Sequence, residues 1–327
     1  MVTKIGIIGY RNHAQRLISL VDNDDKCELV CIFHPDKKID DLRGTNNFSE
    51  LLNCDVIIIA SPNDTHFDYL MKLENFSGYI LCEKPPAVNL KELDELRKIH
   101  SSRKSKIFFN FNYRFSNFND ILTKNLNTEE IGKIMYIEII SSQGLAFKQE
   151  YANSWRADGK NNRFNLLDTV TIHYIDLISH HFGKSKNQFY FPKLISKNGT
   201  SYDTGHLILE YDECSVSIFN SYATPLIIEL NIIGSNGQLS IKNNVLEIKT
   251  PRDTFDEKQF FIMPPTSVQK KINMTEDYSL SLKKSFDFFI SHVFEKRKID
   301  EVFFETSLNT TDLILKLRNT KNEQIST

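Results

Sequence analysis

The sequence has no excess of charge of either sign and no long apolar run. Its 327 residues include 40 basic and 42 acidic side chains, and no basic stripe with interleaved aromatic residues is present. This composition excludes the electrostatic footprint of a nucleic-acid-binding protein. The apolar run at residues 56–60, Val-Ile-Ile-Ile-Ala, is not exceeded in length elsewhere and is far too short to span a membrane. We therefore expect no nucleic-acid partner and no membrane-spanning segment.

Cysteine is scarce, and the spacing of the cysteines matches no redox or metal-binding motif. The five cysteines are Cys27, Cys31, Cys54, Cys82 and Cys214, and they form neither a C-x-x-C pair nor a metal-binding pattern with histidine. Three of them lie in or beside apolar strand-like runs, where a buried, reduced thiol is expected. Residues 1–6 lack the long apolar segment of a secretory signal. These observations predict a cytoplasmic protein without a metal ion.

The first third of the chain alternates between two kinds of hydrophobic pattern. Short apolar runs predict strands at residues 4–9, 28–33, 55–60, 79–82 and 106–111. Between them, apolar residues at helical spacing predict helices at residues 12–22, 66–73 and 90–99. Strands that alternate with helices through short connections form a parallel, doubly wound sheet. We therefore predict an α/β Rossmann-type domain over residues 1–117.

The pattern changes after residue 117. A helix is predicted at residues 118–126, and strands follow at 133–142, 188–195, 205–211, 215–222, 227–233, 238–241 and 245–249. No crossover helices separate most of these strands, so the sheet is expected to be mostly antiparallel. Helices at residues 164–182, 279–294 and 307–317 complete the prediction, which is an α+β domain over residues 118–327.

The segment at residues 78–86 ends a predicted strand abruptly. Glu83, Lys84, Pro85 and Pro86 follow the apolar run in direct succession. Proline has no backbone N–H, so the hydrogen-bond ladder stops there and the chain leaves the sheet. Lys84 is thereby left at the carboxyl end of a strand, where open α/β sheets bind their ligands. On its own, a Glu-Lys-Pro sequence is more often a pair of solvated charges.

The turn after the first strand is the expected phosphate site of such a sheet. The dinucleotide pattern G-x-G-x-x-G/A falls on Gly9, Arg11 and Ala14, so the second glycine is missing. Arg11 either covers a phosphate with its guanidinium or crowds the nucleotide out. Asn12 and His13 lie in the same turn and are candidate cofactor contacts.

The acidic residue that hydrogen-bonds the ribose in NAD-type sites is also missing from its usual position at the end of the second strand. His34 occupies its expected position after the second strand, and Asp36 follows two residues later. Without that acid a 2′-phosphate is tolerable, so the choice between NAD and NADP stays open.

The chain also carries an ordered set of short motifs. They are residues 4–9, Ala60-Ser61-Pro62-Asn63 with His66, Glu83-Lys84-Pro85, Asn112-Tyr113-Arg114-Phe115, Trp155-Arg156, and His173-x-x-Asp176. In this order, over nearly the whole chain, they resemble the glucose-fructose oxidoreductase, inositol dehydrogenase and rhizopine catabolism family of NAD(P)-dependent oxidoreductases. Each motif is modest alone, and their order makes the resemblance specific.

The resemblance implies roles for residues of the first domain. Lys84 matches the family lysine that lies beside the nicotinamide and the substrate carbinol and assists proton transfer, and Glu83 and Pro85 flank it at the cofactor. The loop that contains Ser61, Pro62 and Asn63 borders the cofactor in relatives. His66 is placed with the cofactor contacts, although bracing the following helix is the commoner role for such a residue.

For the second domain, the resemblance implies a substrate pocket. Its candidates here are Tyr113, Trp155, Arg156 and Asp176. Arg156 or Arg163 is suited to grip a hydroxyl or a phosphate. The plainer alternatives are a core-edge indole with a surface salt bridge for Trp155 and Arg156, and structural support for Tyr113. Asp176 is expected to brace its helix or the lysine loop rather than to meet the substrate.

The predicted helix at residues 164–182 differs from the corresponding helix of the family in the position of its acidic residue. In the family an Asp and a His four residues apart share one helix face. Here His173 fits, but Thr169 stands four residues before it and the acid, Asp168, is about 100° away around a regular helix. Either an irregular helix start brings Asp168 to the site, or Thr169 supplies only a hydrogen bond and Lys84 with His173 carry the proton transfer. The sequence slightly favours the second alternative.

Together these features predict an NAD(P)-dependent oxidoreductase that moves hydride between nicotinamide and a sugar, sugar-nucleotide or cyclitol carbinol or ketone. We expect a small sugar-like substrate and a homodimer or homotetramer formed through the apolar face of the C-terminal sheet. Two alternatives stay open. One is a regulatory homologue that binds a nucleotide or sugar with reduced turnover, and the other is an enzyme that uses bound NAD as a redox relay without net oxidation.

Overall fold

The computed structural model describes residues 2–126 and 128–319. It divides the chain into two compact units, each made of two segments. The first unit comprises Met1–Asn112 and Ser281–Leu315, and the second comprises Tyr113–Leu280 and Lys316–Thr327. The sequence predicted one boundary after residue 117, with both closing helices in the second domain.

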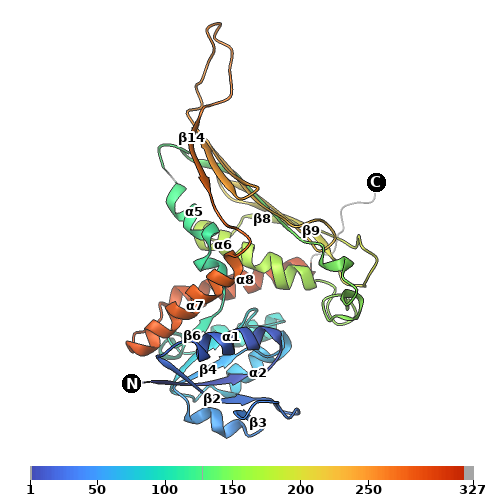
Figure 1. Ribbon diagram of the computed structural model, residues 1–327, viewed down its shortest axis with the longest axis vertical. Helices are drawn as coiled ribbons and strands as arrows, with labels where there is room; N and C mark the ends of the chain where they lie inside the picture. The colour runs from blue at the N-terminus through green and yellow to red at the C-terminus, as the bar shows by residue number, and fades with distance from the viewer. Residues whose placement is uncertain (1, 127, 320–327) are drawn as a thin grey trace. The chain divides into compact units, whose positions relative to one another are not determined.

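A six-stranded, wholly parallel sheet forms the centre of the first unit (Figure 1). Its order is β3-β2-β1-β4-β5-β6. The strands are β1 (Thr3–Ile8), β2 (Cys27–Phe33), β3 (Gly44–Thr45), β4 (Val56–Ile59), β5 (Tyr79–Cys82) and β6 (Ile107–Phe109). The predicted Rossmann-type sheet is therefore confirmed. The sequence missed β3, because its two residues are too few to show a hydrophobic period.

Helices surround this sheet in the first unit. They are α1 (Asn12–Asp22), α2 (His66–Lys72), α3 (Leu90–Arg97), α4 (Ser101–Lys104), and the larger parts of α7 (Asp277–Phe294) and α8 (Glu301–Asn319). The last two helices pack on the edge strand β6: Phe108 lies 5.8 Å from Phe289, and Phe109 lies 5.1 Å from Phe304, measured between ring centroids. This aromatic packing explains why residues 281–315 belong to the first unit, since it buries the phenylalanine side chains of β6.

An eight-stranded sheet forms the second unit, in the order β14-β13-β12-β11-β7-β10-β9-β8. Its strands are β7 (Ile134–Ser142), β8 (Asn187–Lys193), β9 (Thr204–Glu210), β10 (Ser215–Ser221), β11 (Ile227–Gly234), β12 (Gln238–Lys242), β13 (Val245–Lys249) and β14 (Thr266–Lys271). Only β7 and β10 pair in parallel, so the predicted mostly antiparallel sheet is confirmed. The sequence missed β14, whose side chains are mostly exposed and polar.

One face of this sheet is buried and the other is open. The cross-strand row Leu207, Ile218, Ile139 and Leu230 is at most 1% exposed. Helices α5 (Asn117–Asn125) and α6 (Ile172–Phe182) lie beside the strands of the sheet in Figure 1.

The helix predicted at residues 164–182 is a regular α-helix only from Ile172 onward. A π-helical turn, Leu167–Thr171, precedes this regular part.

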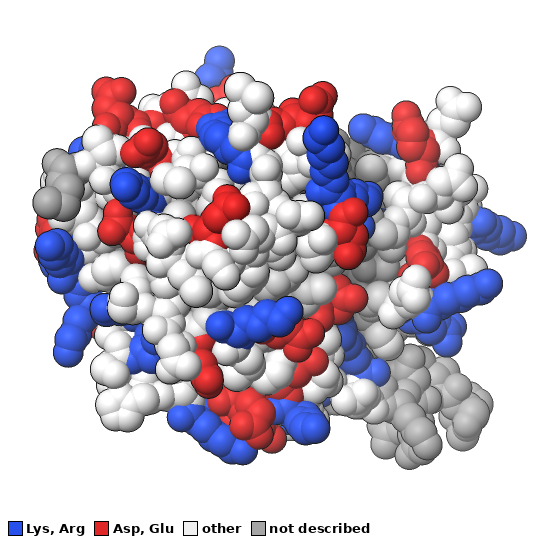
Figure 2. Space-filling view, turned by 90° about the horizontal axis from the view of Figure 1, so that it is seen from below, with Lys and Arg blue, Asp and Glu red and all other residues white. Residues whose placement is uncertain are grey.

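Charged side chains of both signs are mixed on the surface. On the face shown in Figure 2, Lys and Arg side chains alternate with Asp and Glu side chains. No helix in residues 2–126 and 128–319 is both long enough and apolar enough to cross a membrane.

Gly9 occupies a backbone position that other residues adopt with strain. It follows β1 with a φ of +112°, and a Cβ added there would lie 2.6 Å from the carbonyl oxygen of Ala60. We expect Gly9→Ala to lower the free energy of unfolding by at least about 1–3 kcal/mol, from backbone strain and this clash. The measurement is urea denaturation followed by circular dichroism.

Gly144 offers a matched control for this substitution. Its φ is −81°, and the nearest atom to an added Cβ is 3.7 Å away. Gly144→Ala should change the unfolding free energy by less than about 0.5 kcal/mol. Equal effects of the two substitutions would contradict the assignment of strain to Gly9.

Candidate functional site

The strand end that carries Lys84 is held by a buried hydrogen-bond network within the first unit. Glu83 is 6% exposed; its carboxylate accepts a hydrogen bond from Asn110 Nδ2 at 2.6 Å, and His13 Nε2 lies 2.8 Å from the same oxygen. The Asn110 Oδ1 atom accepts in turn from Ser285 Oγ at 2.7 Å. The network therefore links α1, β5, the end of β6 and α7. Lys84 itself is half-buried, and its bond to Pro85 is a cis peptide bond.

The charge of Glu83 follows from this network. Burial alone would raise the pKa of the Glu83 carboxyl, but the His13 ring, the Asn110 amide and the positive charge of Lys84 together lower it. Glu83 is therefore a carboxylate, and the charge beside Lys84 is fixed as negative. His13, proposed as a cofactor contact, is placed against Glu83.

His66 braces the Lys84 loop against the loop after β4. Its ring is fully buried, with Nδ1 2.8 Å from the Pro85 carbonyl oxygen and Nε2 3.0 Å from the Ser61 carbonyl oxygen. Burial lowers the pKa of this histidine, so the neutral ring is favoured, and its one N–H donates to one carbonyl at a time. These contacts are those of a residue that braces two loops, which is one of the two roles that the sequence left open for His66.

The turn at Gly9 has two features of a dinucleotide phosphate site, although Arg11 replaces the second glycine of the pattern. β1 lies between β2 and β4, so the strand order reverses beside it, and this is where doubly wound sheets bind nucleotides. Helix α1 starts directly after the turn and has 11 residues, and its N-cap residue, Arg11, makes no side-chain capping hydrogen bond. The first backbone N–H groups of α1 are therefore available to an anion. Arg11 and Asn12 are exposed beside them.

The other predicted cofactor contacts lie at the ends of neighbouring strands. His34 directly follows β2, and its Nδ1 accepts hydrogen bonds from the backbone N–H groups of Asp36 and Lys37, which leaves Nε2 as the donor side of the ring. Pro62 and Asn63 start the short 3-10 turn after β4, and Ser61 Oγ accepts a hydrogen bond from Thr65 Oγ1 at 2.7 Å. These positions fit a nucleotide that runs along the carboxyl ends of β1, β2 and β4.

In the second unit, His173 is oriented by an aromatic stack. Its ring lies 4.7 Å from the Tyr113 ring at an interplanar angle of 27°, and Tyr113 contacts Tyr174 edge-on at 5.2 Å. His173 is 7% exposed. The stack fixes the plane of the imidazole, so Tyr113 positions His173.

Asp176 forms a buried ion pair with Arg114. The Arg114 guanidinium donates from Nε to Oδ2 at 2.7 Å and from Nη2 to Oδ1 at 2.6 Å, and both side chains are at most 2% exposed. This two-point contact occupies both carboxylate oxygens. Asp176 is thus held by Arg114, a partner that the sequence did not identify.

The π turn before α6 changes the register between Asp168 and His173. In a π turn residues five apart stack as residues four apart do in an α-helix, so this turn accommodates the extra residue that separates the pair. The irregular helix start that was one of the two alternatives is thus present.

The Asp168 carboxylate is nevertheless engaged elsewhere. It is 1% exposed, accepts from Asn162 Nδ2 at 2.6 Å, and pairs with Arg318 through Nε at 3.0 Å and through Nη2. The sequence contained no signal for Arg318, because it lies 150 positions away.

Thr169 and Tyr222 form a second polar group of the second unit. Thr169 Oγ1 donates to the Asn165 carbonyl oxygen at 2.5 Å and is 2.9 Å from the Tyr222 hydroxyl. The Arg156 guanidinium lies 4.5 Å from the Trp155 ring centroid. Trp155 is 48% exposed, so it is no core indole. Within residues 2–126 and 128–319, no group of three or more His, Cys, Asp and Glu side chains is arranged to hold a metal ion.

Two family models match the chain in succession. Residues 3–111 match the model described as the oxidoreductase family, NAD-binding Rossmann fold, and residues 123–314 match its C-terminal alpha/beta domain. The chain therefore belongs to this oxidoreductase family, and its first domain is an NAD-binding Rossmann domain.

Individual relatives are distant. Glucose-6-phosphate 3-dehydrogenase of Bacillus subtilis is 25% identical over 184 residues, which are 54% of this chain and 52% of that protein. Inositol 2-dehydrogenase of Rhizobium meliloti is 25% identical over 137 residues, 42% of this chain and 39% of that protein. The matches thus span about half or less of these curated relatives.

Solved structures share the fold over the full chain. An oxidoreductase from Agrobacterium radiobacter, in complex with NAD+, L-tartaric acid and magnesium, has a TM-score of 0.77 at 14% identity, and the match covers 98% of each chain. A myo-inositol dehydrogenase from Corynebacterium glutamicum has a TM-score of 0.72 at 17% identity, covering 97% of this chain and 96% of that one.

The Arg114–Asp176 pair makes a testable contribution to stability. We expect Arg114→Met to lower the free energy of unfolding by about 3–5 kcal/mol, because it removes the guanidinium that pairs with both oxygens of a buried carboxylate. The Arg114→Met/Asp176→Leu double variant should recover part of this loss. Guanidinium denaturation of the single and double variants measures both effects.

Arg297 provides the exposed counterpart. It pairs with Glu295, and these two side chains are 51% and 55% exposed. Arg297→Met should cost about 0–1 kcal/mol, because water screens the pair. If Arg114→Met lowers the free energy of unfolding by no more than Arg297→Met does, the buried pair is not required for stability.

Proposed function

We propose that this protein is an NAD(P)-dependent oxidoreductase that interconverts a carbinol and a ketone on a sugar, sugar-nucleotide or cyclitol. The observation that carries the proposal is Lys84, placed at the carboxyl end of β5 and flanked by the buried Glu83 network. Membership of an oxidoreductase family with an NAD-binding domain supports it. Relatives that include a glucose-6-phosphate 3-dehydrogenase and an inositol 2-dehydrogenase support the substrate class.

The cofactor would be held by the loops after β1, β2 and β4. The backbone N–H groups at the start of α1, together with Arg11 and Asn12, would bind the pyrophosphate, because that helix start lacks a side-chain cap. His34 would contact the adenosine ribose through its Nε2 side. The loop of Ser61, Pro62 and Asn63, braced by His66, would border the nicotinamide, which supplies the hydride acceptor or donor.

The remaining chemistry is proton transfer by side chains of this chain. Lys84 Nζ would take the proton from the substrate hydroxyl during oxidation and return it during reduction. Glu83 and His66 hold its loop in place. His173, fixed by the Tyr113 stack, would orient the reacting oxygen through its ring nitrogens. Asp168 is neutralised by Arg318, which supports the alternative in which Lys84 and His173 carry the proton transfer without it.

The proposal is tested by replacing Lys84. Lys84→Ala should lower kcat by about 10²–10⁴-fold on the true substrate, because general acid–base catalysis contributes that much. The Lys84→Ala protein should still bind NADH or NADPH, which is measured by nicotinamide fluorescence. His173→Asn should lower kcat as well, while the cooperative unfolding transition is kept. The assay is a panel of sugars and cyclitols with whichever nucleotide binds.

Lys98→Ala is the matched control, since Lys98 is exposed in the same unit and pairs with Glu95 in a surface contact. A Lys84→Ala protein with the rate of the Lys98→Ala protein would overturn the assignment. If neither NADH nor NADPH binds to the unaltered protein, the regulatory alternative holds instead. Co-purified NAD that neither exchanges nor becomes reduced during turnover would indicate the redox-relay alternative.

We also propose that two copies of the protein associate through the open face of the eight-stranded sheet. Phe189, Phe191 and Ile233 share that face and are 51%, 38% and 41% exposed. Burying such side chains against a second copy is favourable, and a stable interface needs about 800 Å² from each partner.

Phe189→Glu/Phe191→Glu should convert the oligomer to a monomer, measured by light scattering during size-exclusion chromatography. Phe147→Glu is the control, because Phe147 is an exposed phenylalanine outside the sheet. Retention of the oligomer in the double variant would place the interface elsewhere.

A further inference from the structure

The hairpin that connects β13 to β14 extends beyond the end of the eight-stranded sheet (Figure 1). We call residues 250–265 of this hairpin the arm. Its backbone is held by its own hydrogen bonds, from Asp256 N to the Phe260 carbonyl oxygen at 2.9 Å and from Ile262 N to the Thr254 carbonyl oxygen at 3.1 Å. The Asp256 carboxylate also accepts from the backbone N–H of Phe260, which fixes the turn at the tip. The arm is therefore a preformed element of the second unit.

Large apolar side chains of the arm are exposed to water. Phe260, Phe261 and Met263 are at least 66% exposed, and the Phe261 ring contacts the Phe255 ring at a centroid distance of 4.8 Å. Large exposed apolar patches are rare on monomeric proteins, and where they occur they mark contacts with a partner. An isolated two-stranded hairpin is also only marginally stable in water. A partner that covers the arm would therefore stabilise it.

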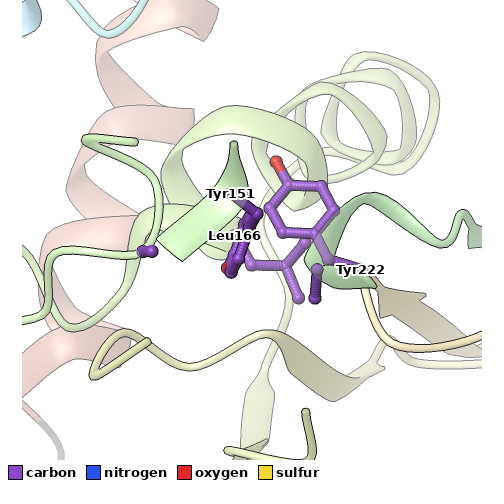
Figure 3. Packing of buried hydrophobic residues seen from close by; sticks show 5 residues of the cluster. Tyr151, Leu166 and Tyr222 are labelled. Atoms are coloured by element: carbon purple, nitrogen blue, oxygen red, sulfur yellow. The ribbon is translucent and has the colours of Figure 1, made fainter. Parts of the chain in front are cut away.

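Aromatic side chains in the body of the second unit are covered, in contrast to those of the arm. Figure 3 shows Tyr151, Leu166 and Tyr222 packed together in a small hydrophobic cluster. The two tyrosine rings lie 6.2 Å apart, and both are almost fully buried. The Phe255–Phe261 ring pair of the arm is held at a similar distance without such cover.

The charges of the arm distinguish between classes of partner. The arm contains three acids, Asp253, Asp256 and Glu257, and two bases, Arg252 and Lys258, so its net charge is −1. A negative charge is repelled by anionic lipids and by nucleic acids. A protein surface that combines apolar and basic side chains is therefore the complementary partner.

A cavity of about 360 Å³ in the same unit has this combination. Its apolar lining includes Ile134 and Phe182, and three lysines also line it. Lys133 and Lys186 are paired with acids of the turn between β9 and β10. Lys184 is exposed and forms no ion pair within residues 2–126 and 128–319. The cavity therefore offers an apolar wall beside one uncompensated positive charge.

The arm and the cavity lie at the same end of the sheet. Strand pairing joins one residue of each strand in a single cross-strand row: Thr266, Lys249, Gln238, Ile233, Tyr136, Ser215, Glu210 and Asn187. Beyond this row, the chain forms the arm at one edge of the sheet and the cavity residues 184–186 and 211–214 near the other edge. Because neighbouring strands are about 4.8 Å apart, β13 and β9 of one molecule are separated by about 24 Å.

A second copy of the chain brings an arm to the cavity. In the proposed association, the open faces of two sheets pack together, and a two-fold axis is the usual relation between two such copies. When this axis runs along the strands, the β14 edge of each copy lies over the β8 edge of the other, and the corresponding ends of the sheets stay together. The arm of each copy is then next to the cavity of its partner.

We propose that the arm of one copy docks at the cavity of a second copy. Phe260 and Phe261 pack against the apolar lining, and the acids of the arm lie near Lys184. The inference rests on the proposed association of two copies for its two-fold axis, and it adds a contact made by different residues. It is tested by association alone, without the hydride-transfer reaction.

Photo-cross-linking tests the contact directly. Phe261→p-benzoylphenylalanine in the full chain keeps an aromatic side chain on the arm, and irradiation links it to its neighbour. We expect a covalent dimer whose cross-linked peptide, identified by mass spectrometry, contains residues 181–186 or 211–214. The same substitution at Leu42, an exposed side chain of the first unit, should give no dimer. A dimer linked through another segment, or no dimer from position 261, would overturn the proposal.

Removal of the two phenylalanines measures what the arm contributes. Phe260→Ser/Phe261→Ser should raise the dissociation constant of the dimer at least about hundredfold, since each buried phenylalanine contributes at least about tenfold. Sedimentation equilibrium measures this constant, and circular dichroism checks that the fold is kept. Leu42→Ser is the control and should leave the constant unchanged. A double variant that associates as tightly as the Leu42→Ser protein contradicts the proposal.

Charge reversal tests the basic side of the cavity. Lys184→Glu should raise the dissociation constant about two- to fivefold at low ionic strength, and the effect should disappear at high salt, because exposed charge pairs are weak and screened. Lys98→Glu is the control in the first unit, where Lys98 is an exposed lysine. Equal constants for these two variants at low salt would overturn the placement of the arm.

The sheet-face variant Phe189→Glu/Phe191→Glu separates the two association proposals. If it stays oligomeric and position 261 still cross-links to the cavity, the arm contact stands and the sheet-face interface fails. If it is monomeric and the dimer of the position-261 protein gives no cross-link, the sheet-face interface stands and the arm contact fails. Binding to phosphatidylcholine vesicles that is lost in Phe260→Ser/Phe261→Ser would identify a lipid surface as the partner of the arm and overturn the proposal.

Discussion

The burial of carboxylates is the constraint on which the two units depend. Glu83, Asp176 and Asp168 are almost entirely removed from water, and such a transfer is costly unless the charge is paired and hydrogen-bonded. Each of the three is compensated by partners from other elements: His13 and Asn110, Arg114, and Arg318 with Asn162. Because His13, Arg114 and Arg318 come from distant parts of the chain, these pairs also fix the loops and helix starts that carry Lys84 and His173.

The same reasoning distinguishes functional from structural charge. An acid that is fully paired, such as Asp176, braces the fold and has no oxygen left for a ligand. Arg156 differs, because its guanidinium lies over the Trp155 ring and it forms no ion pair with a carboxylate in the described part of the chain.

Much of the fold could be predicted from local pattern. Strand β5 and helix α1 were placed correctly because a buried parallel strand and an amphipathic helix each have a period visible within a few residues. β3 and β14 were missed, since the first is too short and the second too polar to show one. The position of Lys84 at a strand end could also be predicted, because Pro85 and Pro86 end the strand in the sequence itself.

The sequence by itself determined the order of elements, the two sheet types and the short motifs, since each depends on residues close together in the chain. Only the tertiary structure decided what those motifs contact. The choice between Asp168 and Thr169 shows why: a one-residue offset in a helix can be absorbed by a π turn, and no periodicity in the sequence reports this. The fate of Asp168 then depended on Arg318, 150 residues away, because pairing of buried charges is set by distance in space and not by distance along the chain.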